Sequence, residues 1–183
     1  MSCRLDEKVM LVKASRAWMC QVTAADVAIC RIADGRPLND RTPSVEIGFH
    51  SGVLRERAGV NVVLHFQTPA ATTLACGDPA AVNYNVIPEI PYYIGPIGIV
   101  PYLPPGSPQL AAAVTAVMKN HDLAMMSSHG QVTVGRSFDD AIQKAVFFEL
   151  ACQIIVQGGQ RIRPLAAEVV AELRAAGSGG GAV

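Results

Sequence analysis

The sequence alternates between short stretches rich in β-branched residues and longer amphipathic stretches along nearly its whole length. Residues 9–14 and 26–32 are typical of strands, whereas residues 107–121 and 137–159 show apolar side chains at helical spacing. Such alternation predicts a sheet covered by helices. Because 183 residues suit one domain with a sizeable core, we expect a single α/β domain over residues 1–176.

Residues 42–59 (TPSVEIGFHSGVLRERAG) predict a helix that begins near Thr42 and Pro43 and ends at Gly59. Glu46 would then lie in the first helical turn. There, exposed backbone N–H groups and the helix dipole favour an anion. The helix start can therefore serve a phosphate-bearing substrate, or it is an ordinary capped helix with a favourable acid.

The amino-acid composition excludes several classes of protein. Half of the residues are hydrophobic, 16% are charged, and 15 basic residues balance 15 acidic ones. Because the net charge is zero, the protein has no overall positive potential that would attract nucleic acid. No apolar stretch reaches the roughly 20 residues of a membrane span. Five cysteines without a CxxC pair predict reduced, buried thiols in a cytoplasmic protein. The glycine-rich residues 177–183 predict a disordered tail.

Two histidines end apolar, strand-like runs. His65 lies in NVVLHFQTP, where a strand would direct His65 and Gln67 to the same face, and His129 lies in LAMMSSHGQVTVG, a predicted strand–turn–strand. Either histidine alone is more often structural than ligating. Together they form a candidate metal site, with Gln67 or Glu46 available to complete it.

The other polar side chains with unusual positions carry weaker predictions. His50 lies four residues after Glu46 on the same helix face, but the intervening residues do not make HExxH, which excludes a zinc-protease motif. His121 follows a polar helix end and is predicted to be solvated. Glu149, within FFELAC, has apolar neighbours, and we expect it at a helix or subunit contact.

Two long segments resemble the class II aldolase/adducin superfamily. They are PSVEIGFHSGVLRERAGVNVVLHFQTPAATTLAC and SSHGQVTVGRSFDDAIQKAVFFELACQ, and with the stretch between them the resemblance covers most of residues 1–157. It implies a three-layer α/β/α fold with a largely antiparallel central sheet, and a homotetramer with sites at subunit interfaces. Ser2 and Arg4 match the end of the family's GNxSxR motif, so an N-terminal segment of the family is expected to be missing.

Within the superfamily, the sequence most resembles the L-fuculose-1-phosphate aldolases. This implies a metal-dependent lyase that splits a small phosphorylated sugar, a ketose 1-phosphate, into dihydroxyacetone phosphate and a small aldehyde. By this resemblance His65 and His129 ligate the metal, Gln67 replaces another histidine ligand, and Glu46 is both acid/base and ligand. The implied cofactor is a divalent metal, Zn²⁺ first, with Mn²⁺ or Mg²⁺ as alternatives because Gln67 offers a carbonyl oxygen.

The resemblance also implies a phosphate site and a proton donor. Ser44 and Ser15 match hydroxyl positions that bind phosphate, and Arg16 stands where a glycine is expected, so it either pairs with phosphate or blocks the loop. Tyr92, with Tyr93 beside it, matches a tyrosine that protonates the leaving oxygen.

Two alternatives remain open. The same scaffold hosts sugar-phosphate epimerases and dehydratases, and it hosts adducin-like binding domains that have lost catalysis. Retention of Glu46, His65 and His129 favours an enzyme, whereas Gln67 favours the binding domain.

Overall fold

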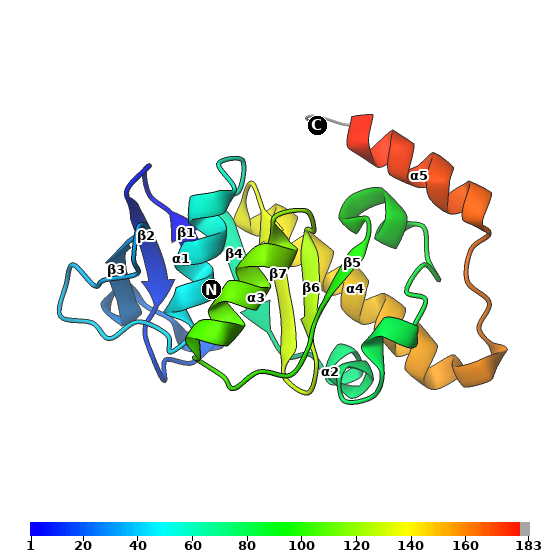
Figure 1. Cartoon of the computed structure of the whole chain (residues 1–183), viewed down its shortest axis with the longest axis horizontal. Helices are drawn as coiled ribbons and strands as arrows, with labels where there is room; N and C mark the ends of the chain where they lie inside the picture. Colours follow the sequence, from blue (N-terminus) through cyan, green and yellow to red (C-terminus); the bar gives the residue numbers. More distant parts are fainter. Residues whose placement is uncertain (180–183) are drawn as a thin grey trace.

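One mixed sheet runs through the molecule. The computed structural model describes residues 1–179. Its strands are β1 (Ser2–Arg4), β2 (Val9–Lys13), β3 (Val27–Arg31), β4 (Val62–Phe66), β5 (Ile97–Val100), β6 (Leu123–Met126) and β7 (Gly130–Gly135). Their order is β3-β2-β1-β4-β7-β6-β5 (Figure 1). Every neighbouring pair is antiparallel except β5 and β6. The predicted largely antiparallel central sheet is confirmed.

Helices cover both faces of this sheet. The α-helices are α1 (Ile47–Glu56), α2 (Pro69–Ala75), α3 (Pro108–Met118), α4 (Phe138–Gly158) and α5 (Ala167–Gly179). Shorter helices are η1 (Met19–Gln21), η2 (Ala24–Asp26), η3 (Pro79–Ala81), the π-helix η4 (Ile90–Ile94) and η5 (Gly159–Arg161). In Figure 1, α1 and α3 pack together in front of the sheet, and α4 crosses behind it, in contact with α2. This arrangement confirms the three-layer α/β fold.

Strand β6 shows how the two halves of the core are separated. All four of its residues are buried, and its side chains alternate between the two faces. Leu123 and Met125 join the cluster under α4, which includes Phe148, whereas Met126 joins the cluster under α1 and α3, which includes Phe49. A strand buried on both faces requires a continuous apolar run, which LAMM provides.

The predicted N-caps of two helices are confirmed. The Ser107 hydroxyl accepts the backbone N–H of Leu110 at 3.1 Å at the start of α3, and the Ser137 hydroxyl accepts that of Asp140 at 3.2 Å at the start of α4. Each hydroxyl satisfies one of the N–H groups that a helix start leaves without an intrahelical partner.

The predicted helix over residues 42–59 is wrong at both ends. Pro43 forms an antiparallel bridge with Ala14, and the carbonyl of Thr42 accepts the N–H of Ser15 at 2.9 Å. These contacts hold residues 42–43 in an extended conformation, so α1 begins only at Ile47. A long-range backbone pairing thus overrides the local capping signal.

The cysteines and the chain end complete the description. Cys30 and Cys152 are buried, but Cys20 and Cys76 are exposed, so the prediction of buried thiols is wrong for these two. α5 lies at the margin beside η4 (Figure 1) and continues to Gly179, and residues 180–183 of the predicted tail lie outside the described residues. Over residues 1–179, no helix combines the length and the apolar character that a membrane span needs.

Candidate metal centre

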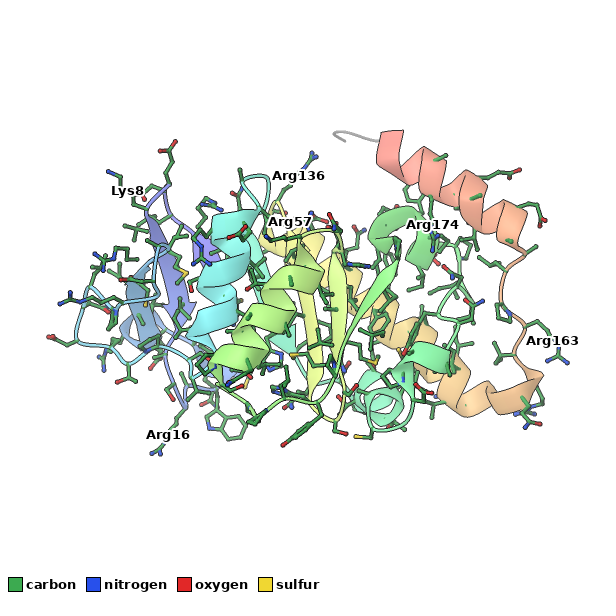
Figure 2. All side chains as sticks on the ribbon, viewed as in Figure 1. Lys8, Arg16, Arg57, Arg136, Arg163 and Arg174 are labelled. Atoms are coloured by element: carbon green, nitrogen blue, oxygen red, sulfur yellow. The ribbon has the colours of Figure 1, made fainter. Side chains whose placement is uncertain are left out.

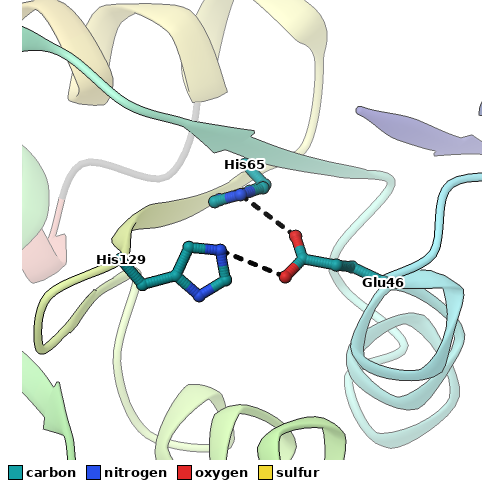
Figure 3. A group of neighbouring side chains, drawn as sticks. All are labelled: Glu46, His65 and His129. Atoms are coloured by element: carbon teal, nitrogen blue, oxygen red, sulfur yellow. Dashed lines mark ion pairs between the residues drawn. The ribbon is translucent and has the colours of Figure 1, made fainter. Parts of the chain in front are cut away.

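Three side chains from separate parts of the chain converge at one end of the sheet (Figure 3). Glu46 immediately precedes α1, His65 lies in β4, and His129 lies in the turn between β6 and β7. Oε2 of Glu46 is 3.0 Å from Nε2 of His65, and Oε1 is 3.2 Å from Nε2 of His129. The predicted juxtaposition of these three residues is therefore present in the structure.

The sheet register brings the two histidines together. β4 and β7 are antiparallel, with His65 opposite Val132 and Phe66 opposite Gln131. The end of β4 therefore lies beside the start of β7, and His129 immediately precedes that start. The two imidazole rings meet edge to face with their centroids 5.1 Å apart.

Glu46 occupies the N-cap position of α1, not its first turn, and its side chain makes no capping hydrogen bond. The prediction that Glu46 lies within the first turn is therefore wrong. The correction has a chemical consequence, because a carboxylate that does not cap its own helix is available to the two histidines. Its side chain is only 6% exposed.

The orientation of His65 is set by a backbone carbonyl. Nδ1 of His65 is 2.9 Å from the carbonyl oxygen of Gln131, which can only accept, so Nδ1 carries a proton. Nε2 then either carries a second proton toward Glu46 or offers its lone pair to a cation. Fixing one ring nitrogen by a backbone carbonyl is the usual arrangement of metal-ligating histidines.

The charges in the cluster suit a cation. Burial raises the pKa of the Glu46 carboxyl, but the hydrogen bond and charge of His65 and the charge of His129 lower it by more, so Glu46 is ionised. Burial lowers the pKa of His129, and the nearby charge of His65 lowers it further, against the opposing effect of Glu46. Among the described residues, Oε1 of Glu46 has no hydrogen-bond partner although it is buried. One carboxylate and two imidazoles form a donor set that fits Zn²⁺ or Mn²⁺.

Gln67 connects the two strands at this site. Its exposed side chain donates from Nε2 to the carbonyl oxygen of His129 at 2.6 Å, which leaves Oε1 as the atom that a cation can contact. Its role as a ligand stays a prediction. Close packing here depends on Gly130, where a Cβ atom would lie 2.8 Å from Cγ of Gln67 and 3.2 Å from Cε1 of His65.

The predicted phosphate-binding residues lie on neighbouring segments. The bridge between Ala14 and Pro43 places the loop of Ser15 and Arg16 beside the segment that contains Ser44. The backbone N–H of Glu46 is 3.4 Å from the Ser44 hydroxyl. Arg16 is exposed, points outward in Figure 2, and has a φ of 62°, a conformation that favours glycine. The roles of these residues in phosphate binding stay predictions.

Tyr92 lies away from the metal centre within one chain. It is exposed in η4, which precedes β5, and its ring contacts that of Tyr93. β5 and β6 are parallel, so η4 lies at the end where both strands begin, whereas His129 follows the end of β6. A role for Tyr92 at the metal therefore requires a second copy of the chain and stays a prediction.

The remaining histidines are outside the cluster. Nδ1 of His50 lies 2.9 Å from the hydroxyl of Ser2 in a fully buried pair, and burial lowers the pKa of His50 well below its ordinary value. Nδ1 of His121 is 2.8 Å from the carbonyl oxygen of Val117. His121 is half-buried, so the prediction that it is solvated holds only in part.

Two residues behind the metal centre complete its surroundings. Glu149 contacts the start of α2, where Oε1 accepts the N–H of Ala70 at 3.0 Å and Oε2 accepts that of Ala71 at 2.9 Å, which agrees with the predicted helix contact. Gln131 was not predicted from the sequence to belong to the site. The signal in the sequence was a polar residue that interrupts an apolar strand just after His-Gly, and in the structure this residue is fully buried.

Comparisons with known proteins give consistent results. The family described as Class II Aldolase and Adducin N-terminal domain matches residues 1–156. A 3-oxo-tetronate 4-phosphate decarboxylase of Escherichia coli O6:H1 is 30% identical over 146 residues, which are 78% of this chain and 69% of the relative. An L-fuculose phosphate aldolase of Methanococcus vannielii is 29% identical over 124 residues, 68% of this chain and 65% of the relative. The crystal structure of YgbL from Klebsiella pneumoniae superposes with a TM-score of 0.87 at 24% identity, covering 94% of this chain and 85% of YgbL.

Proposed function

Because the chain belongs to the class II aldolase and adducin family, we propose that it is a metal-dependent lyase. It would break a carbon–carbon bond in a small phosphorylated sugar or sugar acid. The observation that carries this proposal is the cluster of Glu46, His65 and His129, whose ligand atoms lie within 4.8 Å of one another. Retention of this cluster argues against a binding domain without catalysis.

The two activities named among the relatives share one chemical step. Decarboxylation of a 3-oxo-tetronate 4-phosphate breaks the bond to the carboxylate, releases CO₂ and leaves the electron pair on the ketone as an enediolate. Aldol cleavage of a ketose 1-phosphate breaks the bond between the hydroxylated carbon next to the ketone and the following carbon, and it releases an aldehyde. Either route leaves the enediolate of dihydroxyacetone phosphate, which then needs one proton on carbon. One site can therefore serve both reactions.

Glu46, His65 and His129 would hold the divalent metal, with Gln67 as a further candidate ligand. When bound, the metal would supply Lewis-acid stabilisation of the negative charge that develops on the substrate oxygens. The chain's own residues do the rest. Glu46 is held at the entrance to α1 by its contacts with both histidines, and it would take a proton from solvent and deliver it to carbon. Ser44, Ser15 and Arg16 would bind the phosphate.

Decarboxylation is the reaction that we favour. The decarboxylase relative matches more of this chain than the aldolase relative does. The chemistry also agrees, because CO₂ leaves without a proton transfer, so one acid/base residue suffices. Glu46 is such a residue, whereas aldol cleavage needs a second group to take the hydroxyl proton of the departing aldehyde.

Aldol cleavage of a ketose 1-phosphate, the activity predicted from sequence, is the second candidate. The similarity to an L-fuculose phosphate aldolase supports it. It would use Tyr92 from a neighbouring copy, in keeping with the predicted homotetramer with sites at subunit interfaces.

The test supplies two substrates in parallel assays and measures the one product that both would give. Purified protein is analysed for bound metal and then supplied with 3-oxo-tetronate 4-phosphate or L-fuculose 1-phosphate, and the released dihydroxyacetone phosphate is measured with a coupled dehydrogenase. We expect turnover with the first substrate, with one CO₂ per product. Turnover with L-fuculose 1-phosphate alone would mean that the reaction is aldol cleavage and not decarboxylation. A protein that binds no divalent metal and turns over neither substrate would contradict the proposed function.

A further inference from the structure

A carboxylate on α4 is attached to the chain segment that carries the candidate metal ligands. Glu149 lies in the middle of α4, partly buried, and both of its oxygens point at the start of α2. Oε1 accepts the N–H of Ala70 at 3.0 Å and Oε2 accepts the N–H of Ala71 at 2.9 Å. These donors have no partner within α2, because the first four N–H groups of a helix are unpaired.

The helix start depends on this contact more than is usual. Thr68 holds the N-cap position of α2, but its side chain makes no capping hydrogen bond. Glu149 instead provides a two-oxygen cap from another helix, and its negative charge lies at the positive end of the α2 dipole. The side chain of Gln153, one turn further along α4, donates to Oε1 of Glu149 at 3.2 Å and supports this orientation.

The distance along the chain from this cap to the metal centre is short. His65 lies in β4, and only residues 66–69 separate it from Ala70. The same segment is held at its other end by Gln131, whose carbonyl oxygen is 2.9 Å from Nδ1 of His65. The side-chain oxygen of Gln131 also lies 3.4 Å from the backbone N–H of Thr68.

Little of this segment is free to adjust. Gln67 is joined to the carbonyl oxygen of His129. The backbone of Phe66 lies so close to Gly130 that a Cβ atom there would be 2.8 Å from the carbonyl oxygen of Phe66. A shift of the start of α2 is therefore transmitted to His65 and Gln67, because the hydrogen bonds of Gln67 and Thr68 and the close approach of Phe66 to Gly130 hold the short segment between them.

From this geometry we infer that Glu149 is a positioning residue for the metal centre, acting through the start of α2 on His65 and Gln67. Glu149 itself touches neither the cation nor the substrate. The inference rests on the proposed function only in assuming that the Glu46–His65–His129 cluster binds a divalent cation. Its effect is on cation affinity first and on turnover second, since ligands held in place lose less freedom when the cation binds.

The test measures cation affinity directly. Co²⁺ is titrated into the metal-free protein and followed by its visible absorption, and Zn²⁺ affinity is measured by competition with a chromophoric chelator. Glu149→Gln keeps the shape of the side chain but removes the charge and replaces one acceptor by an NH₂ group that faces an N–H. We expect affinity to fall about tenfold or more, as for other residues that orient metal ligands.

A matched variant separates positioning from general destabilisation. Ser137→Ala also removes an acceptor from helix N–H groups, at the start of α4, but this cap lies at the other end of β7 from the metal centre. It is expected to lower the thermal midpoint while leaving cation affinity within about twofold of wild type. At a temperature where the metal-free variants are fully folded, so that stabilisation by the bound cation does not contribute, saturating Co²⁺ or Zn²⁺ should restore the turnover of Glu149→Gln.

Each outcome has one interpretation. Unchanged affinity in a folded Glu149→Gln protein overturns the inference. If that variant does not fold, Glu149→Asp, which keeps the charge but shortens the side chain, decides the matter: weakened binding supports positioning and unchanged binding overturns it. A wild-type protein that binds neither cation contradicts the proposed function itself, which distinguishes that failure from a failure of the inference about Glu149.

Discussion

His65 and Glu46 meet with Nε2 and Oε2 3.0 Å apart, which joins the end of β4 to the start of α1. This pair would separate if the carboxylate capped its own helix or if the imidazole were turned over. The structure excludes both, because Glu46 makes no capping bond and Nδ1 of His65 is committed to the carbonyl oxygen of Gln131.

The metal assignment is tested by removing one ligand. His129→Ala should lose bound metal, since the remaining carboxylate and imidazole hold a divalent ion too weakly to survive purification. Elemental analysis of the purified proteins measures this. His121→Ala, which removes a histidine outside the cluster, serves as the control and should keep the metal. Equal metal content in both variants would remove His129 from the site.

Gly130 should tolerate no side chain. In Gly130→Ala the new methyl group would lie 2.8 Å from Cγ of Gln67 and from the carbonyl oxygen of Phe66, so the site must shift. We expect a loss of about 1–3 kcal/mol in the free energy of unfolding, together with weaker metal binding. Denaturant unfolding measures the first. Gly59→Ala meets no atom within 4 Å and should change stability by less than about 0.5 kcal/mol.

The pH dependence of stability should involve Asp122. Its oxygens lie 2.8 Å from Nη2 of Arg57 and 2.8 Å from Nζ of Lys144. Burial raises the pKa of Asp122, but the hydrogen bonds and charges of Lys144 and Arg57 lower it below the ordinary 3.8. A carboxyl whose pKa is lower in the folded state stabilises the protein above the unfolded pKa, and this stabilisation is lost as the pH falls through the folded pKa.

Asp122→Asn should therefore be less stable than wild type by roughly 2 kcal/mol at neutral pH, and the difference should shrink as the pH falls below about 4. Urea unfolding at a series of pH values checks this. Asp40→Asn, at an exposed position, provides the control and should follow wild type throughout. A difference that is the same at every pH would mean that the charge of Asp122 is not responsible.

Arg16 has two alternative predicted roles: it pairs with the substrate phosphate, or it blocks the phosphate loop. Its φ of 62° suits glycine, so Arg16→Gly should leave folding intact or stabilise it slightly. If the guanidinium pairs with the substrate phosphate, the substitution should raise KM about tenfold with little change in kcat. Steady-state kinetics with the phosphorylated substrate decide the question. A lower KM would instead indicate that Arg16 blocks the loop.

Tyr92 distinguishes the two candidate reactions. Tyr92→Phe should leave decarboxylation within about twofold of wild type, whereas aldol cleavage that uses the phenol should fall by about 10²–10⁴. Parallel assays with both substrates measure the difference, and Tyr102→Phe, at a strongly exposed tyrosine, is the control. Loss of decarboxylation in Tyr92→Phe would show that the phenol serves that reaction too.

Much of the fold could be predicted from short-range patterns. Ser107 and Ser137 cap the helices as expected, and the apolar spacing of residues 138–158 matches the buried face of α4. The candidate ligands His65, His129 and Glu46 were also identifiable, because the surrounding segments resemble those of a known family. The caps and the helical spacing are encoded within a few residues, where periodicity and capping act, whereas the ligands were identified from the resemblance of long segments.

Only the tertiary structure decided the rest. The pairing of Pro43 with Ala14 displaces the start of α1, the carbonyl of Gln131 orients His65, and the parallel β5 and β6 leave Tyr92 at the far end of the sheet. The sequence by itself determined which groups this protein has for its chemistry. Their arrangement depends on contacts between residues distant in the chain, which local propensities do not contain.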